Sequence, residues 1–162
     1  MTFVAELTPV KASESEFVDR MGLVMERLGA TRSMGRLWAW LMICDPPDPS
    51  LTDLAAELSL SKTAVSTVAR QLEAGGIIER VPAATREHRY RAVGGGWAQI
   101  LRVQLDLVKQ SLETLEYGLS ILDEDRAAQR VRLEETRDFF AFTVQDGDEM
   151  LHRWQKYRDT SS

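Results

Sequence analysis

The sequence contains only one cysteine and two histidines among its 162 residues. Cys44 alone excludes an internal disulfide framework, and its place at the end of an apolar segment favours a buried, unreactive thiol. His88 and His152 have no cysteine, serine or carboxylate at a spacing that favours catalysis or metal binding. The acidic segment 146–149 lacks the spacing and length of a calcium-binding loop. We therefore expect no enzyme, no metal and no cofactor.

Long hydrophobic runs are also missing. No segment approaches the roughly 18 apolar residues of a membrane span, and the first thirty residues alternate charged with short apolar groups, unlike a signal peptide. The triple glycine at residues 94–96 precedes a leucine-rich segment and lacks the pattern of a phosphate-binding loop. These absences predict a cytoplasmic protein of one domain, or of one domain with an oligomerisation layer.

Positive charge is scarce overall but concentrated in one region. The formal net charge is −5, which by itself argues against nucleic-acid binding. Residues 59–93, however, hold six basic residues against three glutamates, whereas the segments on either side are acidic. A basic patch can contact phosphates, while an acidic remainder limits indiscriminate binding.

This basic region begins with two short predicted helices. Ser50 can cap the first, because its side chain can accept a hydrogen bond from the backbone N–H of Asp53. The first helix ends at residues 59–61, and Ser61 then caps a second helix over residues 62–74. Glycines at 75 and 76 end that helix, since glycine adopts the left-handed conformation without steric cost. Two helices joined by a tight turn are typical of a helix-turn-helix.

The second helix of this pair has two different faces. Its apolar residues recur at helical spacing and should pack inward: Val65, Val68, Ala69 and Leu72. The opposite face is short-chained, rich in hydroxyl groups and basic, so it can enter a major groove and contact base edges and phosphates. Together with the capping residue, we predict the following DNA contacts on this helix: Ser61, Lys62, Thr63, Ser66, Thr67 and Arg70.

A predicted β-hairpin follows, with strands over residues 77–81 and 89–93 and a loop over 82–88. We expect the tip of this hairpin to carry Arg86, His88 and Arg89. In a winged helix such a tip lies along the DNA backbone or enters the minor groove. The whole stretch from residue 50 to 93 therefore predicts a winged helix-turn-helix that reads double-stranded DNA.

The stretch resembles the MarR family of bacterial transcriptional regulators, and its GbsR-like branch in particular. The matching segments are residues 35–41, 54–58, 61–66 and 72–80, and a resemblance to regulators of lipid or drug efflux transporters extends to residues 17–22 and 44–46. Many MarR wings carry an Asp-Arg pair at the tip, whereas this tip reads Thr85-Arg86-Glu87-His88-Arg89. The resemblance implies a repressor that a small molecule releases from DNA.

Helical patterns flank the motif on both sides. We expect a loose arm over residues 1–12, a helix from Glu14 to about residue 28, and a core helix that starts at Thr31 or Ser33 and ends at Cys44. Arg36 is the one charge inside the apolar part of that helix, and we expect it in a salt bridge or with its head group in solvent. Beyond the wing, leucines at three- and four-residue spacing predict a long helix to residue 122, and a second runs from about Arg126 to Arg158.

The two long C-terminal helices need a partner, because a core of about 45 winged-helix residues cannot bury their apolar faces. The simplest partner is a second copy, and a dimer places two recognition helices on two half-sites of a palindromic operator, about 34 Å apart. A monomeric helical bundle is the alternative. The predicted organisation is an N-terminal dimerisation layer (residues 1–30), a winged helix (31–93) and C-terminal dimerisation helices (94–162), in a mainly α fold with a small β-wing.

The resemblance also implies an effector site between the DNA-reading lobe and the dimer helices. Its expected lining is apolar, which suits an amphipathic or lipid-like ligand: Met21, Met25, Trp38, Met42, Trp97, Leu101, Phe139, Phe140 and Phe142. The same residues can instead form ordinary core. Two other functions stay open, namely a repressor that responds to choline or betaine and a winged helix used for protein contact without an effector.

Overall fold

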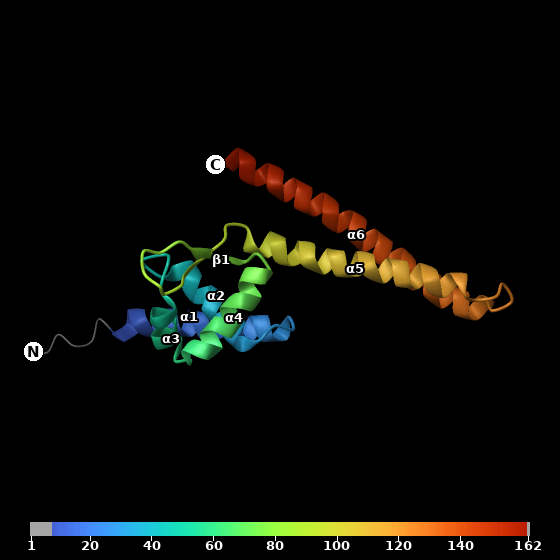
Figure 1. Cartoon of the computed structure of the whole chain (residues 1–162). Coiled ribbons are helices and arrows are strands. Elements are labelled where there is room, and N and C mark those ends of the chain that lie inside the picture. The colour runs from blue at the N-terminus through green and yellow to red at the C-terminus, as the bar shows by residue number, and fades with distance from the viewer. Residues whose placement is uncertain (1–7, 162) are drawn as a thin grey trace, which may run out of the picture. The chain divides into compact units, whose positions relative to one another are not determined.

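The structure is a computed structural model and describes residues 8–161 of the chain. These residues divide into two compact units, and the boundary falls between Gly96 and Trp97. The described chain is mainly helical with one two-stranded antiparallel sheet, as the sequence predicts (Figure 1). The elements are, in order, α1 (Thr8–Arg27), α2 (Arg32–Ile43), α3 (Leu51–Leu58), α4 (Lys62–Ala74), β1 (Ile78–Val81), β2 (Arg89–Ala92), α5 (Gly96–Ser120) and α6 (Ala127–Ser161).

Local capping explains the bounds of α3 and α4. The Ser50 hydroxyl accepts a hydrogen bond from the Asp53 backbone N–H at 3.1 Å, and the Asp53 carboxylate accepts one from the Ser50 backbone N–H at 2.9 Å. This reciprocal pair is a capping box. Ser59 ends α3 in the left-handed conformation, and Ser61 caps α4 by accepting from Ala64 at 3.1 Å. At the far end Gly76 has a positive φ of 71°. The predicted bounds of both helices are confirmed.

The core of the first unit forms around α2. Leu37 and Trp38 on α2 are buried, as are Leu54 of α3 and Leu72 of α4. Tyr90 of β2, only 1% exposed, anchors the sheet in the same core. The predicted inward face of α4 is confirmed, because all four of its apolar residues are buried. Met42 is a correction: expected in the core, it is 42% exposed within the structure.

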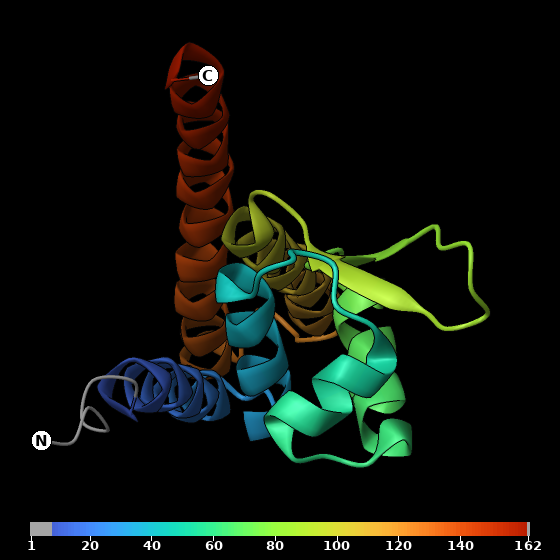
Figure 2. The ribbon, with the colours of Figure 1, turned by 90° about the vertical axis from the view of Figure 1, so that its left-hand side faces the viewer.

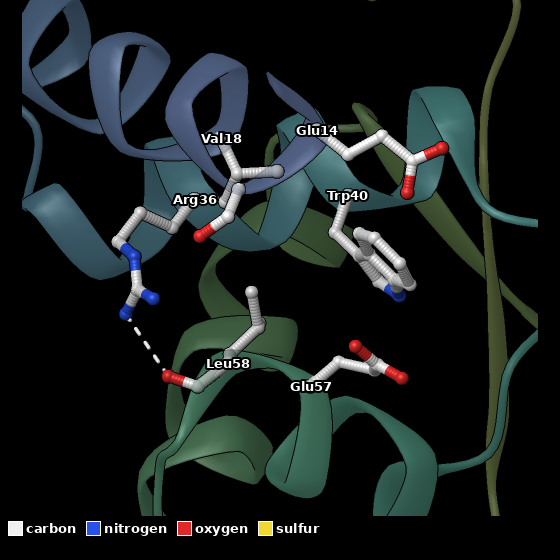
Figure 3. A pocket seen from close by; sticks show the side chains of 7 residues that line it. Glu14, Val18, Arg36, Trp40, Glu57 and Leu58 are labelled. Carbon is white, nitrogen blue, oxygen red and sulfur yellow. Dashed lines mark hydrogen bonds between the residues drawn. The ribbon is translucent and has the colours of Figure 1, made fainter. Parts of the chain in front are cut away.

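Helices α1 and α2 cross at two glycines. A Cβ atom on Gly35 would lie 2.8 Å from the Cα of Gly22 and 2.8 Å from the carbonyl oxygen of Met21. The crossing therefore requires a residue without a side chain at position 35. Nearby, the Arg36 guanidinium donates to the Asp19 carboxylate at 2.8 Å. It also donates to the Leu58 carbonyl at 3.0 Å, a bond that Figure 3 shows. The predicted salt bridge of Arg36 is confirmed, and the same side chain connects α1, α2 and the end of α3.

The start of α1 differs from the sequence prediction. The helix begins at Thr8, six residues before the expected start at Glu14. Pro9 is compatible with this start, because the first N–H groups of a helix have no partner within it. The predicted loose arm is therefore wrong for residues 8–12, and residues 1–7 lie outside the described part. The expected apolar face is only partly buried in this unit: Val18 and Met25 are buried, whereas Leu28 is 61% exposed.

The wing is a short hairpin with a long loop. Strands β1 and β2 pair with Ile78 opposite Ala92 and Val81 opposite Arg89. The segment before α3 lies along the outer edge of β2, since Leu51 donates to the carbonyl of His88 at 2.9 Å. Figure 2 shows the hairpin projecting away from the helices of its unit. The segment that leads into α3 therefore pairs with β2 through one isolated antiparallel bridge, Ser50 opposite Arg89.

The second unit is a hairpin of two long helices. Lys109 of α5 pairs with Asp148 of α6 at 3.2 Å, and Glu116 of α5 pairs with Arg137 of α6 at 3.7 Å, as in an antiparallel helix pair. Gly147 of α6 allows the two helices to approach closely, because a Cβ atom at this position would lie 2.6 Å from the Cδ1 and Cδ2 atoms of Leu105 in α5. The Arg130 guanidinium donates to the carbonyl of Leu119 at the end of α5 and to that of Leu122 just beyond it, at 3.0 Å each. Among the helices of residues 8–161, none has the combined length and apolar character that crossing a membrane requires.

Candidate nucleic-acid interface

The outer face of α4 presents the side chains that the sequence predicts. Lys62, Thr63, Thr67 and Arg70 are exposed, Ser66 is half-buried, and the capping residue Ser61 is exposed at the start of the helix. The hydroxyl of Thr67 donates to the carbonyl of Thr63 at 3.0 Å. That bond leaves the lone pairs of the Thr67 oxygen available as acceptors. The face is narrow and polar over three turns, which suits insertion into a major groove.

The basic residues of this region fall into two groups. Arg80, Arg89 and Arg91 form ion pairs with acidic neighbours, as the following partners show: Glu73 for Arg80, Asp48 for Arg89 and Glu79 for Arg91. Within the described residues no ion pair involves Lys62, Arg70 or Arg86. The Arg70 Nε donates only to the carbonyl of Ser66, at 3.4 Å. Three cations that form no ion pair with the described residues thus lie on α4 and in the wing loop, although the charge of Lys62 acts on the nearby Glu87 carboxylate.

The wing loop carries two of the three residues predicted at its tip. Arg86 and His88 are exposed in the loop over residues 82–88. Arg89 starts β2, where the predicted strand over residues 89–93 begins, and so lies at the base of the loop. It is half-buried, and its Nε donates to the Asp48 carboxylate at 3.3 Å. The sequence could not show this contact, since 41 residues separate the partners.

Glu87 has a role that sequence reasoning missed. Its carboxylate accepts a hydrogen bond from the Thr52 backbone N–H at 2.9 Å and another from the Thr52 hydroxyl. These bonds hold the pKa of Glu87 below its ordinary value, chiefly through the hydroxyl. An acidic residue in a basic tip was the only signal in the sequence, and it did not identify a partner 35 residues away.

The first turn of α3 is thus acidic and fully hydrogen-bonded. Bonds from the backbone and side chain of Ser50 hold the pKa of Asp53 below its ordinary value of 3.8. Both carboxylates, Asp53 and Glu87, lie at the positive end of the helix dipole, where negative charge is favourable. Helix α3 therefore connects the two parts of the interface: the wing loop bonds to its start, and the turn into α4 follows its end.

The residues predicted to line an effector site occur in both units. In the first unit, Met25 and Trp38 are buried and Met21 is half-buried. In the second, the exposures range from half-buried to largely exposed: Trp97 46%, Phe139 65% and Phe142 69%, with Leu101 and Phe140 between buried and exposed. Two of these residues line an open apolar hollow of about 300 Å³ in the second unit, together with four others: Trp97, Ala98, Leu101, Met150, Leu151 and Trp154.

The structure also locates the groups that were considered for other chemistry. Cys44 is half-buried, and burial raises the pKa of its thiol, which favours the unreactive protonated form. Within residues 8–161, no three side chains of His, Cys, Asp or Glu converge as metal binding requires. A hollow of about 200 Å³ where α1, α2 and α3 meet is lined in part by Glu14, Trp40 and Glu57 (Figure 3).

Comparison with known proteins agrees with this arrangement. A family model described as MmpR5-like MarR family transcriptional regulator matches residues 95–157, and one described as MarR family matches residues 41–84. The HTH-type transcriptional regulator MmpR5 of Mycobacterium tuberculosis (strain ATCC 25618 / H37Rv) is 32% identical over 142 residues, covering 87% of this chain and 86% of that protein. A solved structure described as a transcriptional regulator has a TM-score of 0.77 and 32% identity, covering 89% of this chain and 99% of the other.

The fold and the basic face define a winged-helix DNA-binding protein. The chain belongs to the MarR family of transcriptional regulators, with MmpR5-like proteins as its relatives. The family consists of regulators rather than enzymes, which agrees with the sequence expectation. The predicted MarR resemblance is confirmed, whereas the GbsR-like branch and the link to efflux transport stay predictions.

Proposed function

We propose that this protein is a repressor that binds a palindromic operator as a homodimer and leaves it when a small apolar effector binds. In this proposal α4 enters the major groove of each half-site, and the wing loop lies along the backbone. The observation that carries the DNA-binding mode is a set of three cations that form no ion pair with the described residues, namely Lys62, Arg70 and Arg86. Phosphates would supply the anionic partners that the protein itself does not provide.

The roles within the interface follow from side-chain chemistry. Thr63 and Ser66 have short side chains that can reach base edges, so they are our candidates for sequence readout. Arg70, Arg86 and the exposed His88 are candidates for contacts to the backbone, which position the protein without reading sequence. We do not count Arg89 among the main candidates for phosphate contact, because its ion pair with Asp48 supports the base of the wing.

The test of this mode compares three arginine variants. We expect Arg70→Ala and Arg86→Ala to weaken binding to all duplexes and to reduce the slope of log affinity against log salt by about 1, because each loses one phosphate contact. Arg91→Ala is the matched control, since Arg91 already has Glu79 as a partner. Fluorescence anisotropy with labelled duplex at several salt concentrations measures both quantities. Unchanged slopes in the Arg70 and Arg86 variants would remove these residues from the interface.

Support for the homodimer comes from the second unit. Large apolar side chains remain exposed along both long helices of the described chain, among them Leu107, Tyr117, Val131, Phe139 and Phe142. A helix pair that exposes this much apolar surface is stabilised by a partner with the same surface. The alternative function, a winged helix that contacts only other proteins, is less favoured. It gives no role to Lys62, Arg70 and Arg86.

For the effector we propose an amphipathic or lipid-like molecule, and for the controlled genes an efflux or lipid transport operon. The apolar hollow beside Trp97 and Trp154 supports an apolar ligand, because methionine, leucine and tryptophan line it without a charged group. A choline or betaine ligand would need an anionic or aromatic cage for its cation. The described residues that line this hollow include two tryptophans but no carboxylate. Aromatic faces can also hold a quaternary ammonium group, so the repressor that responds to choline or betaine stays the alternative, and ligand titration separates it from the apolar effector.

A further inference from the structure

The wing loop is attached to α3 by a carboxylate. Glu87 receives two hydrogen bonds from Thr52, one from its backbone N–H at 2.9 Å and one from its hydroxyl. The backbone on either side supports the same attachment: Leu51 donates to His88 at 2.9 Å, and Tyr90 donates to Pro49 at 3.2 Å. The end of the loop that carries the candidate phosphate contact is therefore held against the start of α3.

Electrostatics alone makes this carboxylate unfavourable at a DNA interface. Glu87 follows Arg86 directly, so a negative charge lies beside a side chain proposed to approach phosphates. Its charge is partly compensated within the protein, because it accepts a hydrogen bond from the Thr52 N–H at the N-terminus of α3, where the helix dipole favours an anion. The positive charge of Lys62 also acts on it. The charge of Glu87 weakens the attraction to phosphates, yet its carboxylate makes two specific bonds to α3. Its role is therefore better explained by how it holds the wing loop than by its charge.

We propose that Glu87 is a positioning residue for DNA binding, whose contact with Thr52 holds the wing loop so that Arg86 reaches a phosphate while α4 occupies its groove. This role rests on the proposed function, and it assigns Glu87 to the residues that DNA binding requires. Glu87 itself contacts no DNA. Holding the loop in the unbound protein removes an ordering cost that binding would otherwise incur.

The geometry explains why α3 is a suitable anchor. Residues 59–61 alone separate α3 from α4, and Arg36 bonds the carbonyl of Leu58 at the end of α3 to the rest of the unit at 3.0 Å. The start of α3 is held by its capping box. A loop attached to Thr52 is thereby attached to the same rigid body as the recognition helix. Without the attachment, the exposed segment from Pro82 to Arg86 has only its two strands to hold it.

The test uses variants for which charge and position predict opposite results. Glu87→Gln removes a negative charge from the wing, so electrostatics alone predicts tighter binding to duplex DNA. Positioning predicts weaker binding, by about three- to tenfold, because the uncharged amide is a weaker acceptor. Glu87→Asp keeps the charge but shortens the side chain by one methylene group, and positioning predicts a similar loss. The measurement is anisotropy with an operator duplex, with the salt slope recorded for each variant.

Variants of the partner complete the design. Thr52→Val removes the hydroxyl and should weaken binding, whereas Thr52→Ser keeps it and should bind like the unaltered protein. The double variant Glu87→Gln with Thr52→Val should lose no more than the stronger single variant, because both remove one contact. Glu57→Gln is the charge control: an exposed carboxylate on α3 with no hydrogen bond or ion pair in the described chain.

The outcomes separate this proposal from the one it rests on. If the unaltered protein does not bind duplex DNA in a salt-dependent manner, the proposed function fails. If it binds and Glu87→Gln binds equally or more tightly, or Glu87→Asp is unchanged, the positioning role fails while the function stands. Should Glu87→Gln not fold by circular dichroism, the Thr52→Val and Thr52→Ser pair decides. Equal binding by these two would overturn the proposal.

Discussion

At the scale of single residues, the winged helix depends on a few polar side chains beside the backbone. Ser50, only 7% exposed, exchanges hydrogen bonds with Asp53 at the start of α3. This pair satisfies N–H groups that a helix start leaves without partners. The same turn receives Glu87 from the wing. One capping box therefore stabilises a helix and supports the attachment of a loop that is proposed to contact DNA.

Replacing Ser50 tests this cap. We expect Ser50→Ala to lower the free energy of unfolding by about 1 kcal/mol, because a helix start loses its side-chain acceptor. Urea denaturation followed by circular dichroism measures the change. Ser111→Ala is the matched control, since Ser111 lies within α5 and its hydroxyl donates only to the carbonyl of Leu107 in its own helix. A loss no greater than that of the control would show that the cap contributes little.

The same cap gives stability a defined dependence on pH. The folded pKa of Asp53 lies below its ordinary value of 3.8. Its stabilising contribution is therefore fully present above that value and is lost as pH falls through the folded pKa. In unfolding experiments from pH 7 downward, the gap between the unaltered protein and Asp53→Asn should narrow in this acidic window. A gap that stays constant to pH 2 would contradict the role of the carboxylate.

At the scale of elements, two helices approach closely only because glycine occurs at their crossing. Gly35 of α2 lies against Gly22 and the Met21 carbonyl of α1, both backbone groups that cannot rotate away. The sequence showed α2 as an apolar core helix but gave no sign that it crosses α1 at position 35. Sequence periodicity identifies which face of a helix is buried, and the distance to the neighbour depends on both helices together.

Gly35→Ala should separate this pair of helices. The added methyl group would meet backbone at 2.8 Å, and overpacking of this kind costs about 1–3 kcal/mol. We expect a lower midpoint of thermal unfolding, measured by circular dichroism. Gly75→Ala is the matched control, because its Cβ would meet only ordinary contacts at 3.6–3.7 Å and its φ of −77° suits alanine. Equal midpoints for the two variants would contradict the close approach of α1 and α2.

At the scale of the whole molecule, the long helices carry the proposal of a dimer. Phe139 is 65% exposed and Phe142 69% exposed in a single chain. Their exposure in water is unfavourable, and burial of one phenylalanine side chain contributes about 1.5–3 kcal/mol. A second copy is the simplest source of that burial. Two copies also supply two recognition helices for the two halves of a palindromic site.

Light scattering tests the dimer directly. We expect a mass of about twice the 18.3 kDa of one chain at micromolar concentration. Phe139→Glu should shift the protein toward the monomer and weaken binding to a two-half-site duplex, because a charge would enter an apolar interface. Arg132→Glu, at an exposed polar position of the same helix, is the control. A monomer in the unaltered protein would remove both the dimer and the two-half-site arrangement.

Effector release is the second prediction at this scale. We expect a long-chain fatty acyl compound to weaken operator binding about 5- to 150-fold, the range of typical coupling between two sites. Titration of DNA by anisotropy, with and without the compound, measures the coupling, and tryptophan fluorescence reports ligand binding independently. Choline is the comparison ligand. Release by choline together with no response to apolar compounds would favour the osmolyte-responsive repressor instead.

Much of the first unit was determined by local sequence. The bounds of α4, the capping of α3, the inward face of α4 and the hairpin all follow from caps, glycines and periodicity over a few residues. Each of these features depends on interactions between neighbours in the chain. The start of α1 and the exposure of Met42 escaped prediction, because helix ends and partial burial depend on what packs alongside.

What the sequence alone determined was the class of protein, through one basic motif with recognisable helix starts and ends. Only the tertiary structure decided which charges remain available for DNA. Six basic residues looked alike in the sequence, yet Arg80, Arg89 and Arg91 form ion pairs with carboxylates, while Lys62, Arg70 and Arg86 form no ion pair with the described residues. The attachment of Glu87 to Thr52 was likewise decided by the fold. The physical reason is that an ion pair depends on distance in space, and residues 35 or 41 positions apart meet only after the chain has folded.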